Sequence, residues 1–330
     1  IYKPLYGATD GMFSANGNRD NAFVLLKNVK MYGGFDPANS ITDLTHTRII
    51  PNEETAAPNG TILSGDLDNS NSLTNLDAYH VVIASDINTP ITGTVLSGFT
   101  ITGAYANGVG NIPVNVYSIV RNGGAGFSIT NSQLTIENVR IQGNKCHSDT
   151  SHSNIYGAGL SATYSTLDFR NINFSGNDIV SVSVSSANTK GGAMSIFSSD
   201  ITMKNVSFIN NAVSNNSMYD TSSSGGAIHF ESYGSAYKLN IINGKFFNNL
   251  ALSYRAGNIT SGGAIYYNSP DSLLSLINVS MSGNFANGAG SQTFGGGLRA
   301  EDTGRVNISN SILWGNTKRI GFNTPVMSNL

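Results

Sequence analysis

The chain has 330 residues and a formal net charge of −2, and only 12% of its residues are charged. This balance provides no basic surface for nucleic acid and no charge attraction to an anionic membrane. A content of 37 glycines against 8 prolines suits short strands joined by polar turns and disfavours long helices. The single cysteine, Cys146, excludes an internal disulfide. No stretch reaches the roughly 18 consecutive apolar residues of a membrane-spanning helix, so we expect no transmembrane segment.

The N-terminal region contains short apolar segments that predict strands without a regular spacing. These segments lie at 22–26, 29–32, 61–63 and 81–83, and turn-forming residues separate them. The segment 36–59 has no apolar periodicity, and we expect it to form a loop or a cap. Caps shield the open end of a solenoid.

Further along the chain, one short segment recurs six times. In every copy an Asn precedes a second Asn by six residues and an apolar residue lies between them. The first Asn of each copy recurs every 32 to 38 residues, at Asn138, Asn171, Asn205, Asn243, Asn278 and Asn310. A glycine-rich element, mostly Gly-Gly-Ala followed by an apolar residue, recurs upstream with a nearly equal period and ends at Phe127, Leu160, Met194, Ile228, Ile265 and Leu298.

The apolar residues inside each repeat alternate, as at Leu134 and Ile136, and a period of two indicates strands. Short strands at a fixed period stack as the coils of a solenoid. We therefore predict an all-β fold, a single right-handed parallel β-helix with coils of about 33 residues. Irregular coils and a cap occupy 1–95, and regular repeats occupy 96–330, in one continuous domain.

Equivalent residues of neighbouring coils stack in such a fold. Phe174, Phe208 and Phe246 are predicted to form an interior ladder. The six repeated Asn residues are predicted to form a structural ladder of amides at turns, because Asn tolerates a left-handed backbone. The stretch 104–122 and the polar inserts 148–156, 214–224 and 253–261 are expected to leave the stack as loops.

The pairing of Gly-Gly-Ala with Phe-x-x-Asn resembles the repeats of the chlamydial polymorphic outer membrane proteins. The residues that carry this resemblance include Gly225, Gly226 and Ala227 with Phe208 and Asn211. The N-terminal part is similar to β-helix repeat surface proteins of the Bacteroidetes, through segments such as 32–35, 61–66 and 98–101. The resemblance covers nearly the whole chain and implies export, a secreted or bacterial cell-surface location and, in the first family, adhesion. Because the chain starts at Ile1, we also expect further domains of a longer protein to flank it.

The outward-facing columns of the solenoid are the places where chemistry can occur. After the Gly-Gly-Ala elements, one column is predicted to contain Ser128, Ser161, Ser195, His229, Tyr266 and Arg299. The next is predicted to contain Thr130, Thr163, Phe197, Glu231, Asn268 and Glu301. Three successive coils thus gather His229, Glu231, Tyr266, Arg299 and Glu301.

Three interpretations of this cluster remain open. It is an ordinary exposed polar face, or a glycan-binding face on which Tyr266, His229, Phe197 and Arg299 contact a sugar. The third interpretation is catalysis. A polysaccharide lyase would use His229 or Tyr266 as base and Arg299 as electrostatic partner, whereas a glycoside hydrolase would use Glu231 and Glu301 as its acid and base. If the cluster is catalytic, we expect a groove there whose walls are the inserts 214–224 and 253–261.

A second pair of outward columns ends near the C-terminus in Phe247 and Trp314, which we expect to be exposed. Trp314, the only tryptophan, is either a ligand platform or a contact for an adjoining domain. The sequence therefore favours an adhesin or stalk that binds a glycan or protein on a cell surface, with no nucleic-acid partner.

The remaining possibility is a metal. Asp66, Asp68 and Asn69 place side-chain oxygens close together in one turn, which makes them a weak candidate for calcium. The five His residues and one Cys have no zinc-site spacing. No other cofactor is expected.

Overall fold

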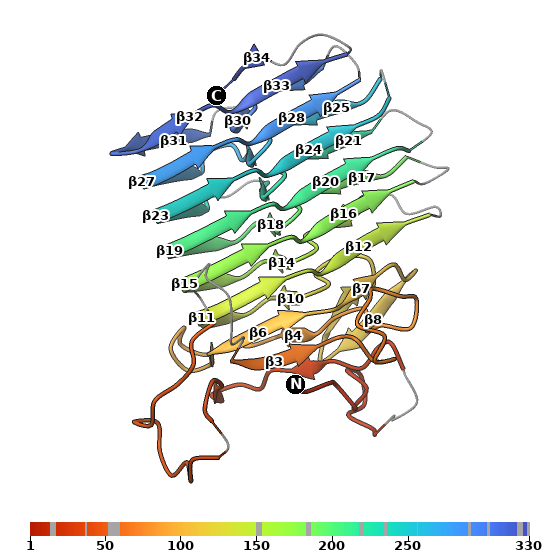
Figure 1. Ribbon diagram of the computed structural model, residues 1–330, viewed down its shortest axis with the longest axis vertical. Coiled ribbons are helices and arrows are strands. Elements are labelled where there is room, and N and C mark those ends of the chain that lie inside the picture. The colour runs from red at the N-terminus through yellow and green to blue at the C-terminus, as the bar shows by residue number, and fades with distance from the viewer. Residues whose placement is uncertain are drawn as a thin grey trace.

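The computed structural model describes residues 1–13, 18–36, 38–51, 60–149, 154–182, 186–217, 221–233, 236–255, 257–289, 292–301, 304–321 and 326–328. These residues contain strands and no helix, and the strands stack as about seven coils of a parallel β-helix. Figure 1 shows the coils in layers along the long axis, from the N-terminus to the C-terminus. The predicted fold class is confirmed. The described residues include no helix long and apolar enough to cross a bilayer.

Four sheets run along the axis, each with one strand or one part of a strand from successive coils. Sheet 1 consists of β1 (Phe23–Val24), β4 (Val82–Ser85), β10 (Phe127–Thr130), β14 (Leu160–Thr163), β18 (Met194–Phe197), β22 (Ile228–Glu231), β26 (Ile265–Asn268) and β30 (Leu298–Glu301). Sheet 2 consists of β2 (Lys30–Tyr32), β3 (Thr61–Ser64), β5 (Val95–Ser97), β6 (Phe99–Thr102), β11 (Gln133–Gln142), β15 (Thr166–Ser175), β19 (Asp200–Ile209), β23 (Lys238–Phe247), β27 (Leu273–Ser282), β31 (Arg305–Ser309) and β32 (Ile312–Trp314).

Sheet 3 consists of β7 (Tyr105–Ala106), β12 (Lys145–Ser148), β16 (Asp178–Ser181), β20 (Ala212–Asn215), β24 (Leu250–Ser253), β28 (Phe285–Gly288), β33 (Thr317–Ile320) and β34 (Val326–Met327). Sheet 4 consists of β13 (Asn154–Tyr156), β17 (Asn188–Lys190), β21 (Ser222–Ser224), β25 (Ile259–Ser261) and β29 (Thr293–Phe294). β8 (Asn111–Val114) and β9 (Tyr117–Val120) form a separate hairpin. The pairs β8–β9 and β33–β34 are antiparallel, and the other strand pairs are parallel.

The interior of the coils is a continuous apolar core. Phe174, Phe208 and Phe246 are fully buried and stack with ring centroids 4.9 and 4.7 Å apart. The interior aromatic ladder predicted from the repeat is therefore confirmed. Because identical side chains recur at one height of each coil, each ring covers the ring of the next coil with few voids.

Asn residues form two ladders along the axis. The predicted outer ladder is confirmed from Asn138 to Asn278, since these residues have a left-handed backbone and each from Asn171 on donates an amide N–H to the Asn of the preceding coil, at 3.0 to 3.2 Å. Asn310 shares the left-handed backbone. The second Asn of each repeat forms an interior ladder that we did not predict. It is fully buried and contains Asn144, Asn177, Asn211, Asn249, Asn284 and Asn316.

The Gly-Gly-Ala elements make the turn into sheet 1 possible. Gly225 has a φ of +67°, a conformation that side chains with a Cβ avoid. A Cβ on Gly226 would lie 2.2 Å from the carbonyl oxygen of Gly263 in the next coil. The first glycine is therefore needed for its backbone angles and the second for close stacking of coils.

Several expected loops contain strands. The insert 104–122 includes β7 and the hairpin β8–β9, and the inserts 148–156, 214–224 and 253–261 end in β13, β21 and β25 of sheet 4. Their tips at 150–153, 218–220 and 256 lie outside the described residues. The described part of 36–59 is irregular, as expected, and residues 37 and 52–59 lie outside the description. Arg48 attaches this segment to the first coils through the Gly33 carbonyl and the Ser97 hydroxyl.

Candidate functional site

The outward side chains of sheet 1 form two columns that the strand register defines. The first contains Ser128, Ser161, Ser195, His229, Tyr266 and Arg299. The second contains Thr130, Thr163, Phe197, Glu231, Asn268 and Glu301. Both columns have the order expected from the repeat. Adjacent members lie about 4.8 Å apart, so the five charged or aromatic candidates gather on three consecutive coils.

A groove of about 540 Å³ lies over the first column and extends across β10, β14, β18 and β22. Its floor contains the hydroxyls of Ser128, Ser161 and Ser195, and His229 and Glu231 lie at its C-terminal end. One wall comes from sheet 4, which precedes the strands of sheet 1 in each coil. The opposite wall comes from aromatic residues at the C-terminal ends of the sheet 1 strands and in the turns that follow them.

The hairpin β8–β9 closes the N-terminal end of this groove. Its buried residues Ile112, Val114 and Ile119 pack against Ile83, which occupies the column position equivalent to Ser128. The Ser85 hydroxyl donates a hydrogen bond of 2.9 Å to the Val114 carbonyl and fastens the hairpin to the coil. The apolar start of the column is thus covered, and the groove begins at Ser128.

The aromatic wall consists of Tyr164, Phe197 and Tyr233. The Phe197 ring lies edge-to-face with both tyrosines, at centroid distances of 5.5 and 5.6 Å. Tyr164 has a φ of +50°, whereas the equivalent residue of the preceding coil is Asn131, with a φ of +46°. A bulky residue in this conformation costs about 1–2 kcal/mol. The chain therefore presents an aromatic ring at the groove at a conformational cost.

The opposite wall contains Asn154 and Tyr156 on β13 and Lys190 on β17. Lys190 Nζ lies 2.7 Å from Glu231 Oε2, and Glu231 also accepts hydrogen bonds from His229 and from the Tyr233 hydroxyl. These bonds, the one from His229 foremost, hold the pKa of Glu231 well below its usual range. The Lys190 charge is therefore compensated at the C-terminal end of the groove.

The floor hydroxyls are free to bind a ligand. Among the described residues, no hydrogen-bond partner reaches the hydroxyl of Ser128, Ser161 or Ser195. Ser128 and Ser195 are each only 5% exposed, so their hydroxyls lie at the bottom of the groove. A polar ligand that enters the groove can therefore gain hydrogen bonds without breaking any within the protein.

His229 is held in one orientation by two hydrogen bonds. Burial lowers its pKa to about 4, so the ring is neutral at pH 7. Its Nε2 lies 3.3 Å from Glu231 Oε2 and its Nδ1 lies 2.8 Å from the Ser224 hydroxyl. Because an ionised carboxylate only accepts, Nε2 carries the proton and Nδ1 accepts from Ser224. Neither ring nitrogen is left to remove a proton from a substrate.

Tyr266 and Glu301 also use their polar atoms within the cluster. The Tyr266 ring stacks on His229 at 4.8 Å, and its hydroxyl donates 2.8 Å to Glu301 Oε2. Burial raises the pKa of Tyr266 above its usual range, which opposes its use as a base. The lowered pKa of Glu231 is the reverse of what a general acid requires. The expected catalytic residues are thus neighbours whose polar atoms are largely used in hydrogen bonds and ion pairs within the cluster.

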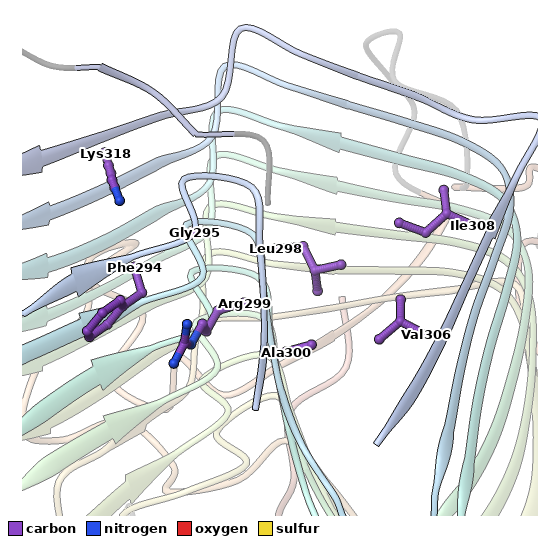
Figure 2. Close-up of a pocket in the computed structure, with 8 residues that line it drawn as sticks. All are labelled: Phe294, Gly295, Leu298, Arg299, Ala300, Val306, Ile308 and Lys318. Carbon is purple, nitrogen blue, oxygen red and sulfur yellow. The ribbon is translucent and has the colours of Figure 1, made fainter. Parts of the chain in front are cut away.

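Arg299 and Tyr266 do not line the groove, which lies toward the N-terminal side of where the sequence placed it. One wall comes from β13 and β17 and the other is the aromatic wall, and β9 lies at the N-terminal end, so the described residues of the inserts 214–224 and 253–261 do not line the groove. Arg299 lies instead beside a cavity of about 410 Å³ at the C-terminal end, where its guanidinium is over the Phe294 ring. Figure 2 shows Leu298, Val306 and Ile308 of the last coil around this cavity.

Phe247 and Trp314 are exposed on the outer face of sheet 2, as expected, at 39% and 67%. They lie in the column that the register of β23, β27 and β32 defines. The open groove lies on sheet 1. Trp314 is therefore not part of it.

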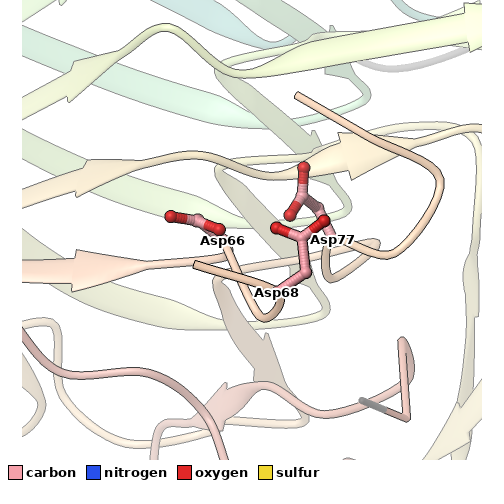
Figure 3. Close-up of side chains that lie close together, drawn as sticks. All are labelled: Asp66, Asp68 and Asp77. Atoms are coloured by element: carbon pink, nitrogen blue, oxygen red, sulfur yellow. The ribbon is translucent and has the colours of Figure 1, made fainter. Parts of the chain in front are cut away.

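The expected calcium residues lie in two different environments. Asp66 and Asp68 lie close to a third carboxylate, that of Asp77 (Figure 3). The oxygen of Asn69 instead accepts a hydrogen bond of 2.7 Å from Lys3 Nζ. Burial raises the pKa of Asp77 to about 6, whereas hydrogen bonds from Ser70 and Thr74 lower the pKa of Asp68 to about 2.

Sequence reasoning missed the groove residues outside the two columns. They include Tyr156, Tyr164, Lys190 and Tyr233. Tyr164 and Tyr233 each lie within two residues of the second column, so a search of the turns after each sheet 1 strand for aromatic residues would have found them. No comparable signal points to Asp77.

No protein-family model, no curated protein and no solved structure matches this chain. The structure thus shows a parallel β-helix of about seven coils, and the resemblance of the repeats to surface proteins stays a prediction.

Proposed function

We propose that this protein is a secreted or cell-surface β-helix protein whose groove on sheet 1 binds an extended, uncharged glycan. The observation that carries the proposal is the combination of an aromatic wall with a floor of hydroxyls that have no partner among the described residues. A sugar ring has an apolar C–H face that packs on aromatic rings and hydroxyls that bond to small polar side chains. The groove offers both contacts, the aromatic rings on one wall and the hydroxyls on the floor.

The charge of the groove favours a neutral ligand. Lys190 is the basic residue that lines it, and its ammonium is paired with Glu231 at 2.7 Å. An acidic sugar would compete with Glu231 for this cation, whereas a neutral sugar leaves the pair intact. The low overall charge of the chain adds no long-range attraction for a polyanion.

The direction of the groove favours a polymer over a single sugar. The floor hydroxyls come from three successive coils, about 4.8 Å apart along the axis. That spacing is close to the length of one sugar ring in an extended chain. A glycan aligned with the axis would therefore meet a floor hydroxyl at each successive residue, with the aromatic wall along one side.

The first test is binding to a panel of neutral and acidic polysaccharides, measured by affinity electrophoresis and by calorimetry. We expect neutral polymers to bind wild-type protein. Phe197→Ala and Tyr233→Ala should each raise the Kd about tenfold. This change corresponds to the loss of about 1.4 kcal/mol of binding free energy from the contact between sugar and aromatic ring. Ser161→Leu should abolish binding by filling the floor, and the fold should accept it because Ile83 occupies the same column.

The matched control is Tyr254→Ala, which removes a tyrosine of similar exposure from outside the groove and should bind as wild type. Tyr164→Asn should weaken binding yet change the free energy of unfolding by less than about 1 kcal/mol, since relief of backbone strain offsets the lost ring contact. Loss of binding in Trp314→Ala, with Tyr233→Ala unaffected, would place the binding site on sheet 2 instead. If the wild-type protein shortened the polymer, the groove would be a catalytic site and the proposal of a binding protein would be wrong.

A further inference from the structure

Asp77 is a buried carboxylate with an oxygen that nothing compensates. The residue is fully buried, and one oxygen, Oδ2, accepts the backbone N–H of Thr74 at 2.6 Å. Within the described part of the chain, no donor reaches the other oxygen, Oδ1. A buried carboxylate oxygen without a partner is costly, so this position calls for a bound cation or a proton.

The space beside Asp77 is shaped by two further carboxylates. Asp66, Asp68 and Asp77 each place one oxygen within 4.8 Å of the other two. Figure 3 shows the carboxylates of Asp68 and Asp77 facing each other, with Asp66 to one side. Oxygens bound to one calcium ion lie about 2.3–2.6 Å from it and hence no more than about 5 Å apart. Magnesium requires oxygens at about 2.0–2.1 Å and hence a tighter cluster.

The neighbouring basic residues leave this cluster incompletely neutralised. Arg19 directs its N–H groups to the backbone carbonyls of Asp77 and Tyr105, at 2.6 and 2.5 Å, and not to a carboxylate of the cluster. Lys3 Nζ lies 3.5 Å from Asp66 Oδ2 and is shared with Asn69. Three carboxylates thus lie close together, and Lys3 contacts only Asp66 among them. The negative charge of the cluster is therefore only partly neutralised.

We propose that Asp66, Asp68 and Asp77 bind one calcium ion. The three carboxylates supply at least three of the six to eight oxygens that calcium takes, and water completes the shell. Asp66 borders a cavity of about 770 Å³ at the N-terminal end, through which water and the ion reach the cluster. The hydrogen bonds from Ser70 and Thr74 to Asp68 do not block the site, because each carboxylate oxygen has two lone pairs.

Such an ion would fasten the irregular segment 66–77 to the first regular coils. This segment begins directly after β3 and ends before Ala78, which bonds to both Gly65 and Tyr105 through its backbone. Because Asp66 and Asp68 lie at its start and Asp77 at its end, an ion bound by all three would hold the two ends of the segment together. The cap end of the solenoid would then be stabilised by ligand binding.

The test is calorimetric titration of the chelator-treated full chain with calcium chloride, with thermal unfolding measured in parallel. We expect about one ion per chain, with a Kd of about 10⁻³ M or tighter, and a Tm that rises with calcium. Asp77→Asn and the exposed Asp68→Asn should each abolish binding. Lys3→Gln should tighten it, because the competing ammonium is removed.

The matched control is Asp43→Asn. Asp43 also accepts hydrogen bonds from a nearby Thr in an N-terminal loop, but it is not in the cluster, so this variant should bind calcium as wild type does. No binding at about 10 mM calcium, ten times the weakest Kd expected, would overturn the proposal. Equal binding by wild type and Asp68→Asn would overturn it too, even if Asp77→Asn fails to fold. The groove variants should bind calcium normally, which separates this test from that of the glycan.

Discussion

Each Asn of the interior ladder is bonded on both sides although it is fully buried. Asn177 donates to Asn211 Oδ1 at 3.0 Å and to the Ile141 carbonyl at 2.9 Å, and its own oxygen accepts from Asn144. Because both donors and the acceptor are satisfied, the buried amide costs little and fixes the register of neighbouring coils. The outer ladder uses the same residue type, but water solvates it.

This difference predicts unequal effects for the same substitution. Asn211→Asp would remove two donors and bring a carboxylate against the oxygens of Asn249 and Phe174. We expect the free energy of unfolding to fall by about 3 kcal/mol, the cost of a buried and unpaired charge. Asn205→Asp in the exposed ladder should cost less than about 1 kcal/mol, since Asp also tolerates a left-handed backbone. Denaturant unfolding measures both, and equal losses would contradict the distinction.

His229 predicts how stability depends on pH. Burial lowers its folded pKa from 6.5 to about 4, so between these values the unfolded chain binds a proton that the folded chain does not. The free energy of unfolding should therefore fall as the pH falls from about 6.5 to 4, by up to about 3 kcal/mol for this residue. Glu231, Lys190 and Glu301 are the charged groups that act on it. The lowered pKa of Glu231 acts in the same direction at lower pH.

The measurement is denaturant unfolding of wild type and His229→Gln from pH 7 to pH 4. The variant should lose less stability over this range, because Gln has no proton to gain. The buried His80, whose pKa is also lowered to about 4, accounts for part of the slope that remains. Parallel curves for wild type and variant would show that His229 does not titrate as described.

At the scale of the strand and turn, the coil is a unit that the repeat predicts well. The left-handed Asn, the paired glycines and the stacked Phe174, Phe208 and Phe246 recur at equivalent places because every coil has the same constraint against its neighbours. A residue type repeated at one period can therefore be placed from the sequence. The columns of sheet 1 followed from the same period.

The groove could not be predicted in the same way, because its walls do not repeat. Tyr156 and Tyr233 occur at positions where other coils carry different residues, and their approach to the Ser column depends on the path of the turns. The cover over Ile83 comes from a hairpin inserted outside the period. Asp77 meets Asp68 only because an irregular segment folds back, and local spacing does not encode this.

At the scale of the whole molecule, stability should vary along the axis. Strands β15, β19 and β23 have neighbours on both sides, whereas β31 and β32 pair only with β27 among the described strands. We expect amide hydrogen exchange to be slowest in β15, β19 and β23 and faster by orders of magnitude in β31 and β32. Exchange measured by mass spectrometry of peptides would test this. Uniform protection along the chain would instead mean that all coils open together.

The two Asn ladders have a mechanical consequence. Their hydrogen bonds run from coil to coil, in the same direction as those of the parallel sheets, and they lie at the turns where the backbone ladder is interrupted. A tensile force applied at the two ends therefore loads the sheets and both amide ladders of one interface together. Under this load we expect the interface between two coils with the fewest paired groups to separate first, so that this interface sets the tensile strength of the rod.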